Sequence, residues 1–158
     1  MKHLSWSRFV LLVVALSLVA SSAVFAQGKM DKEMPKEKSL YQRLGGYDAI
    51  AAVVDDFIGR LVADKALSHF FGGASTSSQK HFRQLLVDQV CAVTGGPCVY
   101  IGRDMKTAHS GLGITEAEWQ AGVKDIVAAL DKFKVPQKEK DDLIAIIATT
   151  KSDIVEKP

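Results

Sequence analysis

The chain has 158 residues, 47% of them hydrophobic, and this length suits one sizeable core rather than two domains. Its 20 basic residues face 18 acidic ones, and no basic stripe with interleaved aromatic residues occurs, so nucleic acid is not an expected partner. No alternation of apolar and polar residues reaches strand length, which argues against a β-rich fold.

The N-terminal residues have the pattern of a secretory signal peptide. Lys2, His3 and Arg8 supply positive charge, residues 9–20 are almost entirely apolar, and small residues follow up to Ala26. An uncleaved membrane anchor is the alternative, but the apolar run is shorter than the ~20 residues that a membrane span prefers. We expect cleavage after Ala26, a periplasmic or secreted location, and no membrane association of the mature chain. Cleavage removes Lys2 and Arg8 and no acidic residue, so the mature chain is formally neutral.

The rest of the chain divides into an arm and a helical domain. Residues 27–39 are charged and hold too few apolar side chains to fold alone, so we expect a flexible arm before a domain at 40–158. In the domain, apolar residues recur at helical spacing. After a short helical turn at 40–44, the predicted helices are 47–63, 78–93, 116–133 and 137–155. The sequence therefore predicts an all-α domain, and a self-contained four-helix bundle is its simplest interpretation.

A long, turn-rich connection joins the second and third predicted helices. Gly and Pro occur in it so often that regular structure is confined to a few residues between Met105 and His109. A loop of this length inside a compact domain is uncommon and is usually functional. It ends at Thr115, which is expected to form a capping box with Glu118 at the start of the third helix.

Two features argue against a simple bundle. Phe70 and Phe71 form an aromatic pair at a glycine-flanked corner, and the long connection carries a lone histidine, His109. A haem requires an apolar slot, an aromatic side chain against the porphyrin and a neutral imidazole for the iron. The chain offers all three, so we expect His109 to face a haem in the core.

The motifs of this domain resemble those of group I truncated haemoglobins over roughly residues 39–156. The matching motifs are Tyr41-x-x-Leu44-Gly45-Gly46, Val53-Val54-Asp55-Asp56-Phe57, Phe70-Phe71, Gly95-Gly96-Pro97, Tyr100-x-Gly102-x-x-Met105-Lys106-x-x-His109, Gly111-x-Gly113-Ile114-Thr115 and Val135-Pro136. The resemblance implies a truncated globin fold, a two-over-two helical sandwich, with non-covalently bound haem b. It implies that His109 is the proximal iron ligand and that Phe71 packs on the haem. The other residues expected at the haem are Phe57, Ile58, Phe70, Phe82, Leu85, Leu86, Tyr100 and Met105.

The distal side departs from the family pattern. Many members carry a tyrosine directly after the Asp-Phe of the first long helix, where it donates a hydrogen bond to the bound gas, whereas this chain has Ile58. The second-helix region is longer than in the family pattern, so the candidates facing the iron are His81, Phe82, Leu85 and Leu86. For His81, a distal iron ligand, a distal hydrogen-bond donor and a solvent-exposed residue all stay open. An apolar distal pocket would favour rapid oxygen loss, or carbon monoxide and nitric oxide binding, over tight oxygen storage.

The two cysteines allow more than one interpretation. Export would place Cys91 and Cys98 in an oxidising compartment, where a disulfide between a helix end and the loop would persist; two buried thiols are the alternative. The chain has no C-x-x-C-H motif, so covalent c-type haem attachment is not indicated. A zinc site made from these cysteines, His81 and His109 would match no familiar zinc spacing.

Three functions follow from these patterns. The leading hypothesis is an exported haem protein that binds oxygen, nitric oxide or carbon monoxide, for oxygen transport, ligand sensing or electron exchange with a redox partner. The second is a periplasmic haem-dependent redox catalyst, either nitric oxide-detoxifying or peroxidase-like, which the absence of a tyrosine at Ile58 makes less favourable. The third is a haem-free helical interaction module. A ligand-binding protein is favoured over a dedicated enzyme.

Overall fold

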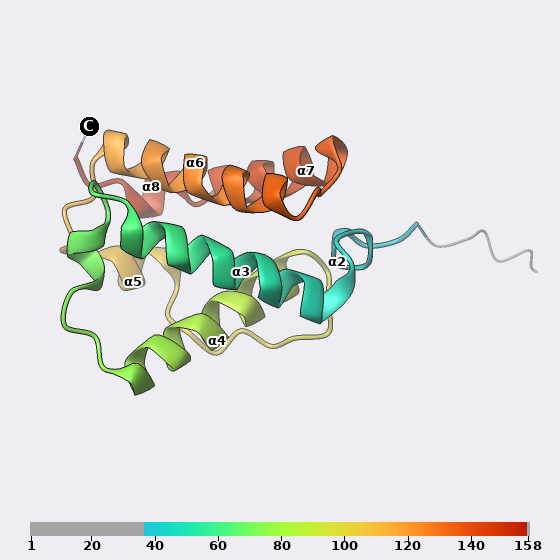
Figure 1. Ribbon diagram of the computed structural model, residues 1–158, viewed down its shortest axis with the longest axis horizontal. Helices are drawn as coiled ribbons and strands as arrows, with labels where there is room; N and C mark the ends of the chain where they lie inside the picture. The colour runs from blue at the N-terminus through green and yellow to red at the C-terminus, as the bar shows by residue number, and fades with distance from the viewer. Residues whose placement is uncertain (1–36, 158) are drawn as a thin grey trace, which may run out of the picture. The chain divides into compact units, whose positions relative to one another are not determined.

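The computed structural model describes residues 37–157, and these residues form a helical domain (Figure 1). The only β-type pairing within them is an isolated parallel bridge between Thr115 and Lys157. The predicted all-α class is therefore confirmed. The predicted signal peptide, 1–26, and nearly all of the predicted arm, 27–39, lie outside the described residues. Of the helices in the described part of the chain, none is long and apolar enough to cross a membrane.

The first pair of long helices is α3 (Gly46–Ala63) and α4 (Thr76–Val93). A short helix, α2 (Leu40–Arg43), precedes α3, and a 3₁₀ turn, η1 (Ser68–Phe71), lies between α3 and α4. This turn contains the aromatic pair that the sequence placed at a corner. In Figure 1, α4 crosses beneath α3, and the two helices pack against each other.

The second pair is α6 (Glu116–Lys132) and α7 (Gln137–Ala148), which pack side by side. Helix α6 also packs on α3, so α3 is in contact with both layers (Figure 1). The result is a sandwich of two helices over two. A short helix in the long connection, α5 (Met105–His109), packs against the last helix, α8 (Lys151–Ile154).

Apolar residues on two sides of α3 hold the sandwich together. One side belongs to a cluster that joins α2, α3, α6 and α7, whose buried members are Leu40, Val53, Ile126, Ala129, Leu130 and Leu143. The other side belongs to a cluster shared with α4, whose buried members are Ile50, Ala51, Val54 and Val87. The apolar stripe predicted for α3 therefore packs in two interfaces, one with α2, α6 and α7 and one with α4.

The ends of the first three long helices lie within two residues of the predicted ones. Helix α3 begins at Gly46, one residue early, and α6 ends at Lys132, one residue early. Helix α4 begins two residues before the predicted start, because the hydroxyl of Ser75 accepts a hydrogen bond from the backbone N–H of Ser78 at 3.2 Å and caps the helix. The predicted capping box at Thr115 is confirmed at the start of α6.

The prediction of a single helix at 137–155 is wrong, because the chain breaks between α7 and α8 at Thr149 and Thr150. Their hydroxyls donate hydrogen bonds to backbone carbonyls three residues earlier, at Ile146 and Ile147, each at 2.7 Å. Side chains that bond to the local backbone in this way compete with the helical ladder. The helical hydrogen bonding is interrupted at these two adjacent threonines, and α8 begins at Lys151.

A disulfide ties the end of α4 to the long connection. The sulfur atoms of Cys91 and Cys98 are 1.97 Å apart, so neither thiol is free to ligate zinc. Gly96 lies inside the loop that this bond closes. A Cβ atom at Gly96 would lie 2.5 Å from the ring of Tyr41 and 2.7 Å from the sulfur of Cys91, so only glycine fits there.

Candidate functional site

A large apolar cavity lies between the helix pairs and the long connection. Its volume is about 1100 Å³, at the upper end of the size range of small-molecule pockets. The structure brings together around it all the residues expected at a haem: Phe57, Ile58, Phe70, Phe71, Phe82, Leu85, Leu86, Tyr100, Met105 and His109. These residues come from α3, η1, α4, the connection and α5, so no single segment forms the cavity.

The exposed apolar side chains of the domain gather at this cavity. Of the large hydrophobic residues exposed within 37–157, all but Val99 and Phe133 line it; they are Val62, Phe82, Val93, Ile101 and Leu112. The exposed fraction reaches 78% at Ile101. Contiguous apolar surface of this kind marks a ligand-binding or partner-binding site. A flat, largely apolar group such as a haem would cover it, so the residues present fit this cofactor.

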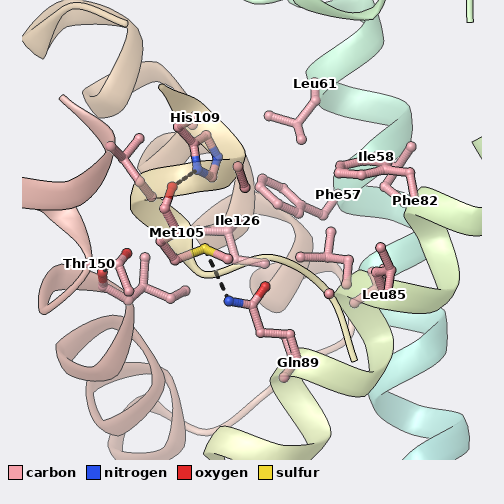
Figure 2. A pocket seen from close by; sticks show the side chains of 18 of the residues that line it. Phe57, Ile58, Leu61, Phe82, Leu85, Gln89, Met105, His109, Ile126 and Thr150 are labelled. Carbon is pink, nitrogen blue, oxygen red and sulfur yellow. Dashed lines mark hydrogen bonds between the residues drawn. The ribbon is translucent and has the colours of Figure 1, made fainter. Parts of the chain in front are cut away.

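His109 projects into the cavity from the last residue of α5 (Figure 2). Its Nδ1 lies 2.8 Å from the backbone carbonyl oxygen of Met105. A carbonyl can only accept a hydrogen bond, so Nδ1 carries the hydrogen and Nε2 keeps its lone pair in the neutral ring. This is the second-nitrogen contact that a metal-ligating histidine usually makes, and it sets both the tautomer and the ring orientation.

Helix α5 depends on contacts outside itself. Five residues are far too few for a helix to be stable in isolation. Asp104 caps the N-terminus by accepting the backbone N–H and the hydroxyl of Thr107, both at 2.8 Å, and these bonds lower the pKa of Asp104. Just before the cap, the hydroxyl of Tyr100 donates to the carbonyl of Arg103 at 2.7 Å, and burial raises the pKa of Tyr100.

The wall opposite His109 is apolar. Figure 2 shows Phe57, Ile58, Phe82 and Leu85 across the cavity from the imidazole. None of these side chains can donate or accept a hydrogen bond. The aromatic corner extends this wall: the ring of Phe71 is 5.9 Å from that of Phe82, centroid to centroid, at a tilt of 51°.

A polar residue that the sequence analysis did not place at the site, Gln89, also lines the cavity. Its side-chain amide donates to the thioether sulfur of Met105 at 3.1 Å, which links α4 to α5 at one edge of the cavity (Figure 2). The sequence contains a signal for this position, because Gln89 is the one polar residue on the apolar stripe of the predicted second helix. In this arrangement one of the two N–H groups of the amide is engaged with Met105, and a thioether accepts only weakly.

His81 borders the cavity from α4, but its side chain is exposed to solvent. It follows the polar N-terminal turns of the helix and directly precedes Phe82, which faces the cavity. A role of His81 as an iron ligand or a hydrogen-bond donor stays a prediction. His69, next to the aromatic corner, has a side chain that is 57% exposed and lies 3.5 Å from a carboxylate oxygen of Glu118.

Comparison with known families and relatives agrees with this geometry. Residues 39–156 match the family described as bacterial-like globin. Group 1 truncated hemoglobin GlbN of Mycolicibacterium paratuberculosis is 34% identical over 116 residues, which cover 73% of this chain and 83% of that protein.

Solved structures show the same similarity. The truncated hemoglobin of Tetrahymena pyriformis in its Fe(III) form superimposes with a TM-score of 0.71 at 27% identity, covering 76% of this chain and 100% of that chain. The 2/2 hemoglobin of Synechococcus sp., in the cyanomet state and with covalently attached heme, superimposes with a TM-score of 0.68 at 27% identity over the same shares. These matches confirm the predicted two-over-two fold.

Proposed function

Because the chain belongs to the bacterial-like globin family as a group 1 truncated haemoglobin, we propose that it is an exported gas-binding protein whose haem iron is held by His109. Membership of this family implies haem and a diatomic gas as ligands. The bound haem would supply an iron centre that takes up the gas. The observation that carries the assignment of His109 is its Nδ1–H donation to Met105, which leaves Nε2 free at the wall of an apolar cavity.

The chain's own residues divide the work at the cavity. His109 would hold the iron through Nε2, while the carbonyl of Met105 keeps the imidazole in the required tautomer. The aromatic corner would pack on the porphyrin through Phe71, and the exposed apolar rim would exclude water. We propose non-covalent haem b, since no C-x-x-C-H motif is present, although a relative in Synechococcus sp. has covalently attached heme.

The apolar wall around Ile58 supports a preference among gases. A bound oxygen molecule is polar and is retained by a hydrogen-bond donor, whereas carbon monoxide and nitric oxide depend less on one. Since Ile58, Phe82 and Leu85 offer no donor, we propose rapid release of oxygen, and tighter retention of carbon monoxide and nitric oxide. This wall favours reversible gas binding over a dedicated nitric oxide dioxygenase.

The ligand assignment is tested by titrating the purified domain with haemin. The wild-type protein should develop a sharp Soret band, and the ferrous–CO form should give the spectrum of a histidine-ligated haem. His109→Ala should lose the band or weaken it strongly, because no other described side chain on that wall offers an imidazole. His69→Ala is the matched control, since this exposed histidine does not line the cavity. An unchanged spectrum in His109→Ala would overturn the assignment.

The distal proposal has its own variant. Ile58→Tyr should place a hydroxyl donor on the wall opposite His109 and slow oxygen dissociation about fivefold, since one net hydrogen bond stabilises by about 1 kcal/mol and a tenfold change needs about 1.4 kcal/mol. Ile58→Phe is the control, because it adds the ring without the hydroxyl. Stopped-flow displacement of oxygen by carbon monoxide measures both rates. Equal rates in the two variants would mean that position 58 does not face the gas.

Export is proposed on two observations. Residues 1–26 have the signal-peptide pattern, and Cys91 and Cys98 form a disulfide, a bond that persists mainly in oxidising compartments. The mature chain should begin at Gln27 and be recovered from the periplasm or the medium. N-terminal sequencing of the fractionated protein checks this, and recovery of the full-length chain from the cytoplasm would contradict it.

A further inference from the structure

The loop that follows His109 is held by a carboxylate from the C-terminal end of the domain. The backbone N–H groups of Gly111 and Gly113 donate to the two carboxylate oxygens of Glu156, at 2.6 Å and 2.5 Å. Both glycines have positive φ, +83° and +65°, a conformation that other residues adopt only with strain. Backbone N–H groups turned to one side in this way form a concave site for an anion, and Glu156 fills it.

The carboxylate of Glu156 is itself fixed in place by its backbone. The N–H groups of Glu156 and Lys157 both donate to the carbonyl of Ile114, at 2.9 Å and 3.2 Å, and the carbonyl of Lys157 accepts from Glu116 at 3.1 Å. The segment therefore lies along the loop as a short parallel pairing that ends at the first turn of α6. Residues 156 and 157 are thus held against the loop by main-chain hydrogen bonds.

This support acts on the histidine through a short covalent path. His109 is the last residue of α5, and its carbonyl accepts the N–H of Leu112 at 3.1 Å, so the turn 110–113 is built directly on it. Gly111 and Gly113 have no side chains with which to anchor this turn. The hydrogen bonds from their N–H groups to Glu156 supply that anchor.

We propose that Glu156 is a positioning residue for His109: by holding Gly111 and Gly113, it fixes the C-terminal end of α5 and hence the direction of the imidazole. The proposal rests on the proposed ligation of iron by His109. Asp104 holds the other end of α5, so the five-residue helix is held at both ends. The two N–H donors, with Lys157 nearby, keep the pKa of Glu156 below its ordinary value, so the carboxylate stays charged at neutral pH.

The test compares Glu156→Gln and Glu156→Ala with Asp153→Asn in the haem-loaded protein. Asp153→Asn removes the same charge from the same end of the chain, and the Asp153 carboxylate makes no hydrogen bond or ion pair within 37–157. Resonance Raman of the ferrous form should show a shifted or broadened iron–histidine stretching band in Glu156→Ala. Haem transfer to an excess of an acceptor globin should be roughly three- to tenfold faster, a modest factor because the site is exposed.

The conservative variant separates positioning from general destabilisation. Glu156→Gln keeps one acceptor oxygen and should give an intermediate band and rate, while Asp153→Asn should match the wild type. Amide hydrogen exchange at Gly111 and Gly113, measured by NMR, should speed up in the order wild type, Gln, Ala, with the thermal midpoint of the haem-free protein changed little.

The outcomes distinguish this inference from the proposed function. An iron–histidine band absent from the wild type would overturn the ligation by His109 and the positioning role with it. A wild-type band that is unchanged in Glu156→Ala, with haem transfer as slow as in Asp153→Asn, would leave the proposed function standing and overturn the role of Glu156. A Glu156→Ala variant with a lowered thermal midpoint and the same band in its folded fraction would also overturn it.

Discussion

The four long helices and the connection between α4 and α6 are held together by different kinds of interaction. The helices are joined by buried apolar side chains, of which Val54, Val87 and Leu130 are at most 2% exposed. The connection buries little. It is held by one disulfide, by the hydrogen bonds that its backbone donates to Glu156, and by the contact of Gln89 with Met105. Hydrophobic burial tolerates small displacements, whereas individual polar bonds fix particular atoms. The scaffold therefore supplies stability and the cavity, and the connection supplies the orientation of its histidine.

The largest expected effect lies in the scaffold. Leu130→Ala should lower the free energy of unfolding of the haem-free protein by about 2–5 kcal/mol, the usual cost of a cavity in a packed core. Leu112→Ala removes the same atoms from the connection, where the side chain is 47% exposed, and should cost well under about 1 kcal/mol. Urea unfolding followed by circular dichroism measures both. Equal losses of unfolding free energy in the two variants would contradict the proposed difference between the helices and the connection.

Removal of the disulfide tests the connection directly. The double variant Cys91→Ser and Cys98→Ser should lose about 2–3 kcal/mol, from the chain entropy of a loop whose ends are seven residues apart. The loss should appear in urea unfolding of the haem-free protein. A reducing agent should lower the stability of the wild type to that of the variant and leave the variant unchanged. A reductant effect on the variant would contradict this explanation.

Two glycine substitutions should have opposite effects in the two regions. Gly96→Ala in the connection would force a Cβ to within 2.5 Å of Tyr41 and should cost about 1–3 kcal/mol. Gly59→Ala, in the middle of α3 with nothing within 4 Å of the added Cβ, should stabilise by about 0.5–1 kcal/mol through helix propensity. Thermal unfolding measures the stability of both variants. A shift of the two midpoint temperatures in the same direction would contradict the packing argument.

The smallest expected effect belongs to a surface ion pair between α3 and α4. Arg83 donates to both carboxylate oxygens of Asp55, at 2.5 Å and 2.8 Å, and lowers the pKa of Asp55. Asp55→Asn should cost less than about 1 kcal/mol at pH 7, because both side chains are over a third exposed.

The pH dependence of that cost follows from the direction of the shift. A lowered folded-state pKa adds stability above the unfolded value of 3.8, and this stability disappears as the pH falls through the lower folded value. The wild type and Asp55→Asn should therefore differ most at pH 7 and converge as the pH falls below 3.8, so that the gap is clearly smaller at about pH 3. Unfolding curves at both pH values measure the difference in unfolding free energy between the two proteins. A difference that widens in acid would contradict a lowered pKa of Asp55.

Prediction from sequence succeeded where a signal is local. The apolar stripe of α3 and the capping box of Thr115 with Glu118 are both contained within a few turns of chain, and both were read correctly. The fourth helix was predicted wrongly because Thr149 and Thr150 are tolerated in helices in general. At the break, both hydroxyls donate hydrogen bonds to main-chain carbonyls three residues earlier. The amino-acid composition does not reveal that these bonds form.

The site divides in the same way. The motif around Met105 and His109 marks the histidine, because the residue type and its glycine-rich setting are visible in one stretch of sequence. The engagement of Gln89 with Met105 was not predicted, since it joins residues on separate helices. The role of Glu156 had no signal at all, because a single exposed-looking glutamate near a chain end is typical of any helical protein.

By itself, the sequence determined the helical class, the ends of the first three long helices to within two residues, and the histidine that faces the cavity, because helical periodicity and clustered glycines act over short stretches of chain. Only the tertiary structure decided which side chains face that histidine, how the disulfide closes the loop, and what supports the turn after it. Those features join residues far apart in the chain, such as Glu156 and Gly111, which are separated by 45 positions. Only the packing of α3 on both layers, with the pairing of the C-terminal segment along the loop, brings such groups within hydrogen-bond distance.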